Sequence, residues 1–77
     1  MRILHTSDWH LGRSFHGASL HDDQVAFVDW LVGVTADEAA DLVVIAGDVY
    51  DRAVPPLESV HLWQSALERL SELAPVL

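Results

Sequence analysis

Two short apolar segments alternate with two longer segments of helical periodicity, and this alternation constrains the fold more than any other feature. Residues 2–6 and 42–46 are short enough for strands, and the second segment, Leu-Val-Val-Ile-Ala, is apolar throughout. A continuous apolar run of that length is typical of a parallel strand that is covered on both faces. A third such run begins at Pro75. The sequence therefore predicts an α/β fold of order β-α-β-α-(β), in which right-handed crossovers join parallel strands.

Both helices are predicted from apolar residues that recur every three or four positions. The first is expected from about Leu20 to about Ala40, after a Ser-x-x-acid pattern at Ser19 that is typical of a helix start. The second is expected to follow the double proline at 55–56, which breaks regular structure and suits a helix entry. Pro75 is expected to end the second helix.

The composition argues against several classes of protein. The apolar share of 51% is too high for a disordered chain, yet no apolar run approaches the roughly 20 residues of a membrane-spanning helix. The absence of cysteine from the sequence excludes disulfides and thiolate metal sites in this segment. The start lacks the features of a signal peptide, so we expect a cytoplasmic protein with no membrane partner.

The formal net charge is −8. A nucleic-acid-binding surface is normally basic, so this charge argues against a DNA-contacting surface within the segment itself. It does not argue against a nuclease, because carboxylates that collect divalent cations also make a formal count acidic.

Polar motifs follow both predicted strands where each strand ends. Asp8 and His10 come after the first strand, and Asp48 follows Gly47 after the second. Functional residues gather at the carboxyl ends of parallel strands, so adjacent strands would bring these loops together. In extended chain, Asp8 and His10 would point the same way, with Trp9 turned to the other side. A carboxylate and an imidazole suit a divalent transition metal, and two metals bridged by Asp48 would hold a phosphate ester and activate water.

Each motif is weak by itself. An Asp-x-His pair is common by chance, Gly-Asp after a strand is more often a plain turn, and the pair Asp51–Arg52 could be a surface ion pair of little energetic weight. The conjunction favours a metal site, since both motifs end apolar strands in the same order along the chain, with one helix between them.

The pattern after the two strands is Asp8-x-His10 followed by Gly47-Asp48-x-x-Asp51-Arg52. This pattern resembles the first two signature blocks of the calcineurin-like metallophosphoesterases. Within that superfamily, residues 1–12 and 46–56, double proline included, resemble the D subunit family of SbcCD nucleases. The resemblance implies that residues 1–77 are the N-terminal part of a four-layer metallophosphoesterase domain. They would be truncated before a third block, Gly-Asn-His, that follows the third strand.

The resemblance also implies roles for individual residues. Asp8 and His10 would hold the first of two divalent metal ions, and Asp48 would bridge both. Asp51 would orient a catalytic histidine from the third block, and Arg52 would contact the phosphate. The implied metal is manganese, with magnesium as the alternative.

The function implied by the resemblance is that of a DNA exonuclease and hairpin endonuclease in DNA repair, recombination and replication. Phosphodiesters would be hydrolysed by in-line attack of a metal-activated water. The implied partners are double-stranded DNA ends and hairpins, and a coiled-coil ATPase subunit of SbcC type that joins a homodimer of the nuclease subunit in a heterotetramer. The 77-residue chain alone is expected to be inactive, because it supplies only part of the ligand set.

Three alternatives stay open. The first is another calcineurin-like phosphatase or phosphodiesterase, and the second is an inactive fragment. The third is a non-catalytic α/β signalling module of receiver type, which would carry an acid pair after the first strand, where this sequence has Asp8-Trp9-His10.

Outside these motifs, His5 is expected to be a buried histidine of the first strand and His16 a surface residue. Leu62, Trp63, Ala66 and Leu73 widen the apolar stripe of the second helix beyond one buried face. We therefore expect an exposed patch there, of which Leu62, Trp63 and Ala66 contribute to a two-fold contact. The alternative is that later parts of the same chain cover them.

Overall fold

The computed structural model describes residues 1–15, 18–51 and 54–77. Its elements are, in order, β1 (Ile3–Ser7), β2 (Ser14–Phe15), β3 (Ala18–Ser19), α1 (His21–Asp37), β4 (Leu42–Ala46) and α2 (Leu57–Ser71). The predicted β-α-β-α order is confirmed. The antiparallel pair β2–β3 was not predicted, because two-residue strands are too short for their alternation to be recognised.

β4 is the middle strand of a small parallel sheet. β1 pairs with β4 in parallel, with Ile3 opposite Leu42. After Pro75, Val76 forms a parallel bridge with Val43 on the other edge of β4. The expected third strand therefore begins beside β4, and the sheet grows in one direction along the chain.

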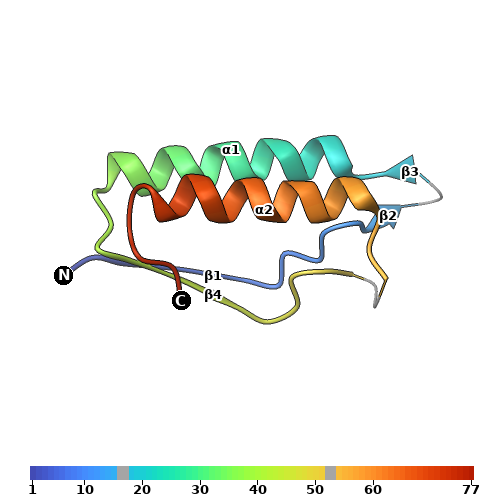
Figure 1. Cartoon of the computed structure of the whole chain (residues 1–77). Coiled ribbons are helices and arrows are strands. Elements are labelled where there is room, and N and C mark those ends of the chain that lie inside the picture. Colours follow the sequence, from blue (N-terminus) through green and yellow to red (C-terminus); the bar gives the residue numbers. More distant parts are fainter. Residues whose placement is uncertain (16–17, 52–53) are drawn as a thin grey trace.

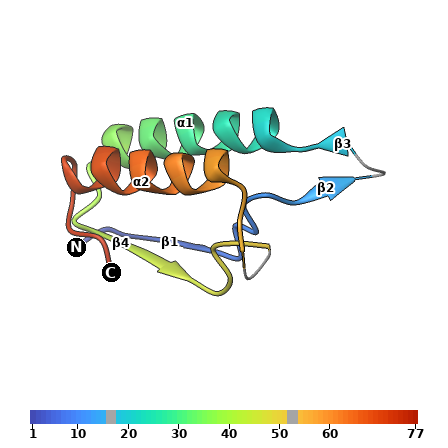
Figure 2. The ribbon, with the colours of Figure 1, turned by 45° about the vertical axis from the view of Figure 1, so that its right-hand side comes forward.

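Both helices lie side by side on the same face of the strands, as two views of the ribbon show (Figure 1 and Figure 2). This arrangement follows from the strand order, because successive right-handed crossovers in one direction put their helices on one face. Neither helix of the described chain is long and apolar enough to cross a bilayer.

The opposite face of β1 is exposed in the described residues, whereas every residue of β4, the strand expected to be covered on both faces, is buried or half-buried. Exposed and half-buried residues alternate along β1, because successive side chains of a strand point to opposite faces. Ile3 is 57% exposed, and His5 lies on the same exposed face. The expectation that His5 is buried was therefore wrong.

α1 begins and ends inside its predicted bounds. Its N-cap residue is Leu20, and within the described residues no side chain caps it. The predicted capping by Ser19 was wrong, because its Oγ accepts a hydrogen bond from the His21 N–H at 3.1 Å, at the very first helical residue. At the other end, Ala39 takes a left-handed conformation with φ 49°, which stops the helix before the expected Ala40.

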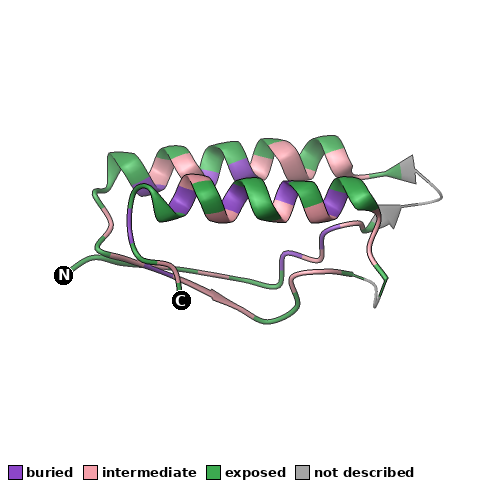
Figure 3. Cartoon of the chain, viewed as in Figure 1, coloured by how far each residue is buried: buried purple, intermediate pink, exposed green. Residues whose placement is uncertain are grey.

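The core lies between the helices and the sheet, and buried positions recur along both helices (Figure 3). Leu62 and Ala66 belong to this core, with 9% and 0% of their surface exposed. Trp63 is half-buried, and its ring meets that of Trp9 edge-to-face at 5.3 Å. The expected exposed patch of Leu62, Trp63 and Ala66 was therefore wrong, because the stripe is wide enough to meet both α1 and the loop after β1.

Candidate metal centre

The loops after β1 and β4 run side by side beyond the ends of the strands. The Asp8 N–H donates to the Ala46 carbonyl at 3.0 Å, and the His10 N–H donates to the Asp48 carbonyl at 3.1 Å. Leu11 then bridges Tyr50 in parallel. Backbone pairing thus continues through the two motifs and fixes one loop against the other, as expected for the carboxyl ends of adjacent parallel strands.

The ligand-bearing loop is held in a conformation that the sequence did not predict. Asp8 has φ 54° and His10 has φ 50°, in the left-handed region that residues with side chains seldom adopt. Between them Trp9 is only 8% exposed. Its Nε1 donates to Thr6 Oγ1 at 3.0 Å. Trp9 is buried while Asp8 is exposed and His10 is half-buried, and two left-handed residues, not an extended chain, produce this difference.

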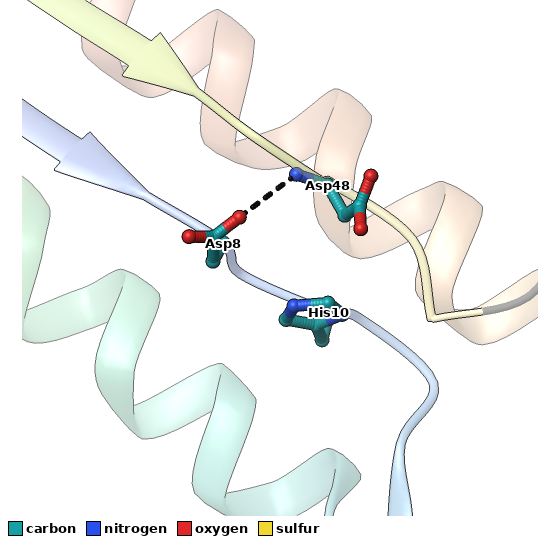
Figure 4. A group of neighbouring side chains, drawn as sticks. All are labelled: Asp8, His10 and Asp48. Carbon is teal, nitrogen blue, oxygen red and sulfur yellow. Dashed lines mark hydrogen bonds between the residues drawn. The ribbon is translucent and has the colours of Figure 1, made fainter.

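Asp8, His10 and Asp48 each offer one ligand atom, and these atoms all lie within 4.8 Å of one another. Figure 4 shows Asp8 and His10 on the loop after β1 and Asp48 on the neighbouring loop after β4. The Asp48 N–H donates to Asp8 Oδ1 at 3.2 Å, which turns the Asp8 carboxylate toward the second loop. Both carboxylates are exposed and His10 is half-buried, so solvent reaches the group.

This donor set fits a divalent metal ion. Two ligands that are about 2.1 Å from one ion, at a tetrahedral angle, lie about 3.4 Å apart. The limit of 4.8 Å on the separations in the group includes that value. Two carboxylates and an imidazole are ligands that manganese, zinc and iron accept.

Gly47 makes room for the Asp8 carboxylate. Its φ is 76°, a conformation that glycine adopts without steric penalty. A Cβ added at this position would lie 2.0 Å from Asp8 Oδ1 and 2.8 Å from Asp8 Cγ. The tight turn was expected from the sequence, whereas the close approach of a ligand carboxylate was not.

Asp51 contacts His10 and Arg13. Its Oδ1 lies 3.3 Å from His10 Nδ1 and accepts two hydrogen bonds from Arg13, from Nε at 3.2 Å and from Nη2 at 3.1 Å. The role expected for Asp51, orientation of a histidine from a later block, concerns a residue outside this chain. Arg52 and His16 lie outside the described residues.

Of the two further residues that contact the motif loops, Arg13 and Gln24, sequence reasoning missed Gln24. Gln24 lies near the start of α1 and hydrogen-bonds to the backbone of His10 and of Gly12. A glutamine in the first turns of a helix is ordinarily a surface residue, so no sequence signal distinguished it. Arg13 carried only the weak signal of a basic residue beside a motif in an acidic chain.

Comparison with known proteins finds one matching family and related nuclease subunits. The model of the family described as calcineurin-like phosphoesterase matches residues 1–77. The chain is 48% identical over 72 residues to the D subunit of nuclease SbcCD from Escherichia coli strain K12. The same identity and length hold for the D subunit of nuclease SbcCD from Escherichia coli O157:H7. Each alignment covers 94% of this chain and 18% of the relative, so the chain spans about a fifth of the length of these proteins.

Proposed function

This chain belongs to the calcineurin-like phosphoesterase family, and from that membership we propose that it supplies the opening part of a metal-dependent DNA nuclease domain. The observation that carries the proposal is the convergence of Asp8, His10 and Asp48 at the carboxyl ends of β1 and β4. The similarity to the D subunit of nuclease SbcCD supports a nuclease over other phosphoesterases of the family. Membership of the family also disfavours the receiver-type signalling module.

In this proposal Asp8 and His10 hold one divalent ion and Asp48 bridges it to a second, with the remaining ligands on later parts of the domain. Such ions supply Lewis-acid polarisation of a phosphodiester and make water a better nucleophile. We propose manganese, with magnesium as the alternative, from the resemblance to the SbcCD D subunit family. The two carboxylates suit either ion, and the imidazole disfavours magnesium, which prefers oxygen ligands and retained waters.

The protein residues contribute position and charge. The Asp48 N–H orients the Asp8 carboxylate, and buried Trp9 anchors the loop between the two ligands. The exposure of both carboxylates leaves the ligand group open to a phosphodiester from solvent. We further propose that Arg52 contacts the phosphate and that Asp51 orients a histidine, by analogy with the family pattern.

The whole protein's substrates and partners follow from the family resemblance. We propose double-stranded DNA ends and hairpins as substrates in repair, recombination and replication. We propose a coiled-coil ATPase subunit of SbcC type as partner, and a homodimer within a heterotetramer as the assembly. Because this segment has a net charge of −8, the basic surface that binds DNA must lie on other parts of the assembly.

The proposal is tested by Asp48→Asn in the complete protein, meaning the longer protein of which we propose this chain is the opening part. We expect the rate of manganese-dependent cleavage of duplex DNA to fall at least about a hundred-fold, because a bridging ligand loses its charge. The melting temperature should stay close to that of the parent, since the backbone N–H that orients Asp8 remains.

The matched control is Asp37→Asn, which removes an exposed carboxylate at the end of α1 and should leave the rate unchanged. Cleavage by Asp48→Asn at the parent rate, or cleavage by the parent in the presence of a chelator, would contradict the proposed function.

A further inference from the structure

Gln24 holds the ligand-bearing loop from α1 through both ends of its side-chain amide. Its Oε1 accepts a hydrogen bond from the Gly12 N–H at 3.1 Å, and its Nε2 donates one to the His10 carbonyl oxygen at 2.9 Å. Both hydrogen bonds are partly buried. An amide presents one acceptor and two donors in a fixed plane. Gln24 therefore pairs with a backbone N–H and a backbone carbonyl of the loop, as the peptide groups of a neighbouring strand would.

One residue of the segment that Gln24 holds is conformationally strained. His10 has φ 50°, whereas the φ of 92° at Gly12 carries no steric penalty for glycine. A residue with a side chain persists in the left-handed region only where surrounding contacts determine its conformation. Gln24 supplies one of those contacts at His10 itself.

Among residues 1–15, 18–51 and 54–77, the backbone of His10 has three hydrogen-bond partners. Its N–H donates to the Asp48 carbonyl at 3.1 Å, and its carbonyl accepts from the Arg13 N–H at 3.2 Å and from Gln24 Nε2. The first partner belongs to the opposite loop, the second to the same loop, and the third to α1. Gln24 is therefore the contact that ties the position of His10 to the helix.

The ring of His10 is oriented separately from its backbone. Asp51 Oδ1 lies 3.3 Å from Nδ1, and Arg13 holds that carboxylate by two hydrogen bonds. Because Nδ1 faces this carboxylate, Nε2 is the nitrogen left for an ion; metal-binding histidines commonly turn their other ring nitrogen toward a carboxylate. The distance from Nε2 to the two aspartates is then set by where the backbone of His10 stands.

We propose that Gln24 is a positioning residue of the metal centre: by fixing the backbone of His10, it sets the place of the imidazole relative to Asp8 and Asp48. The inference rests on the proposed function and deepens it. The competing interpretation is that Gln24 only fastens the loop to the fold, with no effect on the geometry of the ligands.

The test is Gln24→Met in the complete protein, because methionine keeps the length of the side chain and loses both hydrogen bonds. We expect the affinity for Mn²⁺ to fall about ten-fold, the lower end of what removal of outer contacts of a metal ligand causes. Electron paramagnetic resonance of the protein titrated with Mn²⁺ measures this affinity. The spectrum at saturation should also differ from that of the parent, because the ligand geometry has changed.

Two further variants separate the causes. Gln24→Glu keeps the acceptor for the Gly12 N–H and loses the donor to His10, so it should weaken Mn²⁺ binding as Gln24→Met does. Asp22→Asn changes an exposed residue in the first turn of α1 and should bind Mn²⁺ like the parent. The melting temperature without metal is recorded for each variant, and Gln24→Glu decides the question if Gln24→Met does not fold.

The outcomes are distinct. Parent-like affinity and an unchanged spectrum in a folded Gln24→Met or Gln24→Glu variant overturn the inference and leave the metal centre standing. A loss of binding that only matches the unfolded fraction also overturns it, in favour of a purely structural role. A parent protein that binds no Mn²⁺ overturns the metal centre itself, and the inference with it.

Discussion

At the scale of single residues, Gly47 and the Asp8 carboxylate share one small space. Any side chain at position 47 would collide with Oδ1 of Asp8, where an added Cβ would lie at 2.0 Å. It would also have to adopt a φ of 76°. Because Asp8 is a proposed ligand, a substitution at Gly47 would disturb the metal centre although it replaces no ligand.

We therefore expect Gly47→Ala to lower the affinity for Mn²⁺ at least ten-fold and the free energy of unfolding by about 1–3 kcal/mol. Calorimetric titration and urea unfolding of the complete protein measure the two effects. The control is Gly33→Ala in α1, where an added Cβ meets nothing within 4 Å and should raise stability by about 0.5–1 kcal/mol. Parent-like Mn²⁺ binding by Gly47→Ala would show that the Asp8 carboxylate moves aside at no loss.

The sequence allowed the candidate ligands to be predicted, but not what holds them. Asp8, His10 and Asp48 were identified because each follows an apolar strand, and parallel strands bring their carboxyl ends together. The role of Gln24 was not predicted because its hydrogen-bond partners are backbone atoms, which are present at every position of any sequence. Its part in the centre depends on the left-handed turn of the loop, which no local pattern signals.

At the scale of elements, the two helices share one apolar core, and Ala66 belongs to it. It is fully buried on α2, one helical turn after Leu62. Ala66→Leu should therefore lower the free energy of unfolding by about 1–3 kcal/mol through overpacking. Ser65→Leu, at an exposed neighbouring position, should change it by less than about 0.5 kcal/mol.

Thermal and urea unfolding of both variants provide the measurement. Equal free energies of unfolding for the two variants would mean that α2 packs loosely at Ala66. That result would favour the sequence-based expectation of an accessible patch there.

The order of elements was predictable because periods of two and of three to four residues are strong signals in the long segments. The short pair β2–β3 was not, since two residues do not define a period. The start of α1 was predicted one residue early. A Ser-x-x-acid pattern fits a serine at the N-cap position, but it also fits a serine one residue before the N-cap, which is where Ser19 lies. The tertiary packing around Trp9, which contacts Phe27 and Trp63, decides which apolar residues of α2 are buried.

At the scale of the whole molecule, the described chain has one covered face and one open face. Ile3 on β1 is 57% exposed, and an apolar pocket beside the C-terminal run is lined by residues that include Ile45, Trp63 and Leu67. Exposed apolar surface often marks a contact with further structure. We propose that later parts of a four-layer domain cover it.

We expect the purified 77-residue chain to cleave duplex DNA with manganese at least about a hundred times more slowly than the complete protein. In the proposed centre this chain supplies only Asp48 to the second ion, and ligand number sets both metal occupancy and the activation of water. Cleavage assays at equal protein and Mn²⁺ concentrations measure the ratio. Comparable rates for the two proteins would mean that the first two motifs suffice for catalysis.

Protein synthesis separates the two halves of the proposed centre in time. The hydrogen bond from the Asp48 N–H to Asp8 Oδ1 joins positions 40 apart in the chain. At ribosomal rates of about 5–20 residues per second, Asp8 is made roughly 2–8 s before its partner. Until β4 emerges and pairs with β1, nothing on the second loop holds Asp8 and His10 in their left-handed conformations. A nascent chain from which β4 has not yet emerged therefore lacks the proposed cation site. Metal binding at this site is confined to the time after β4 has left the ribosome.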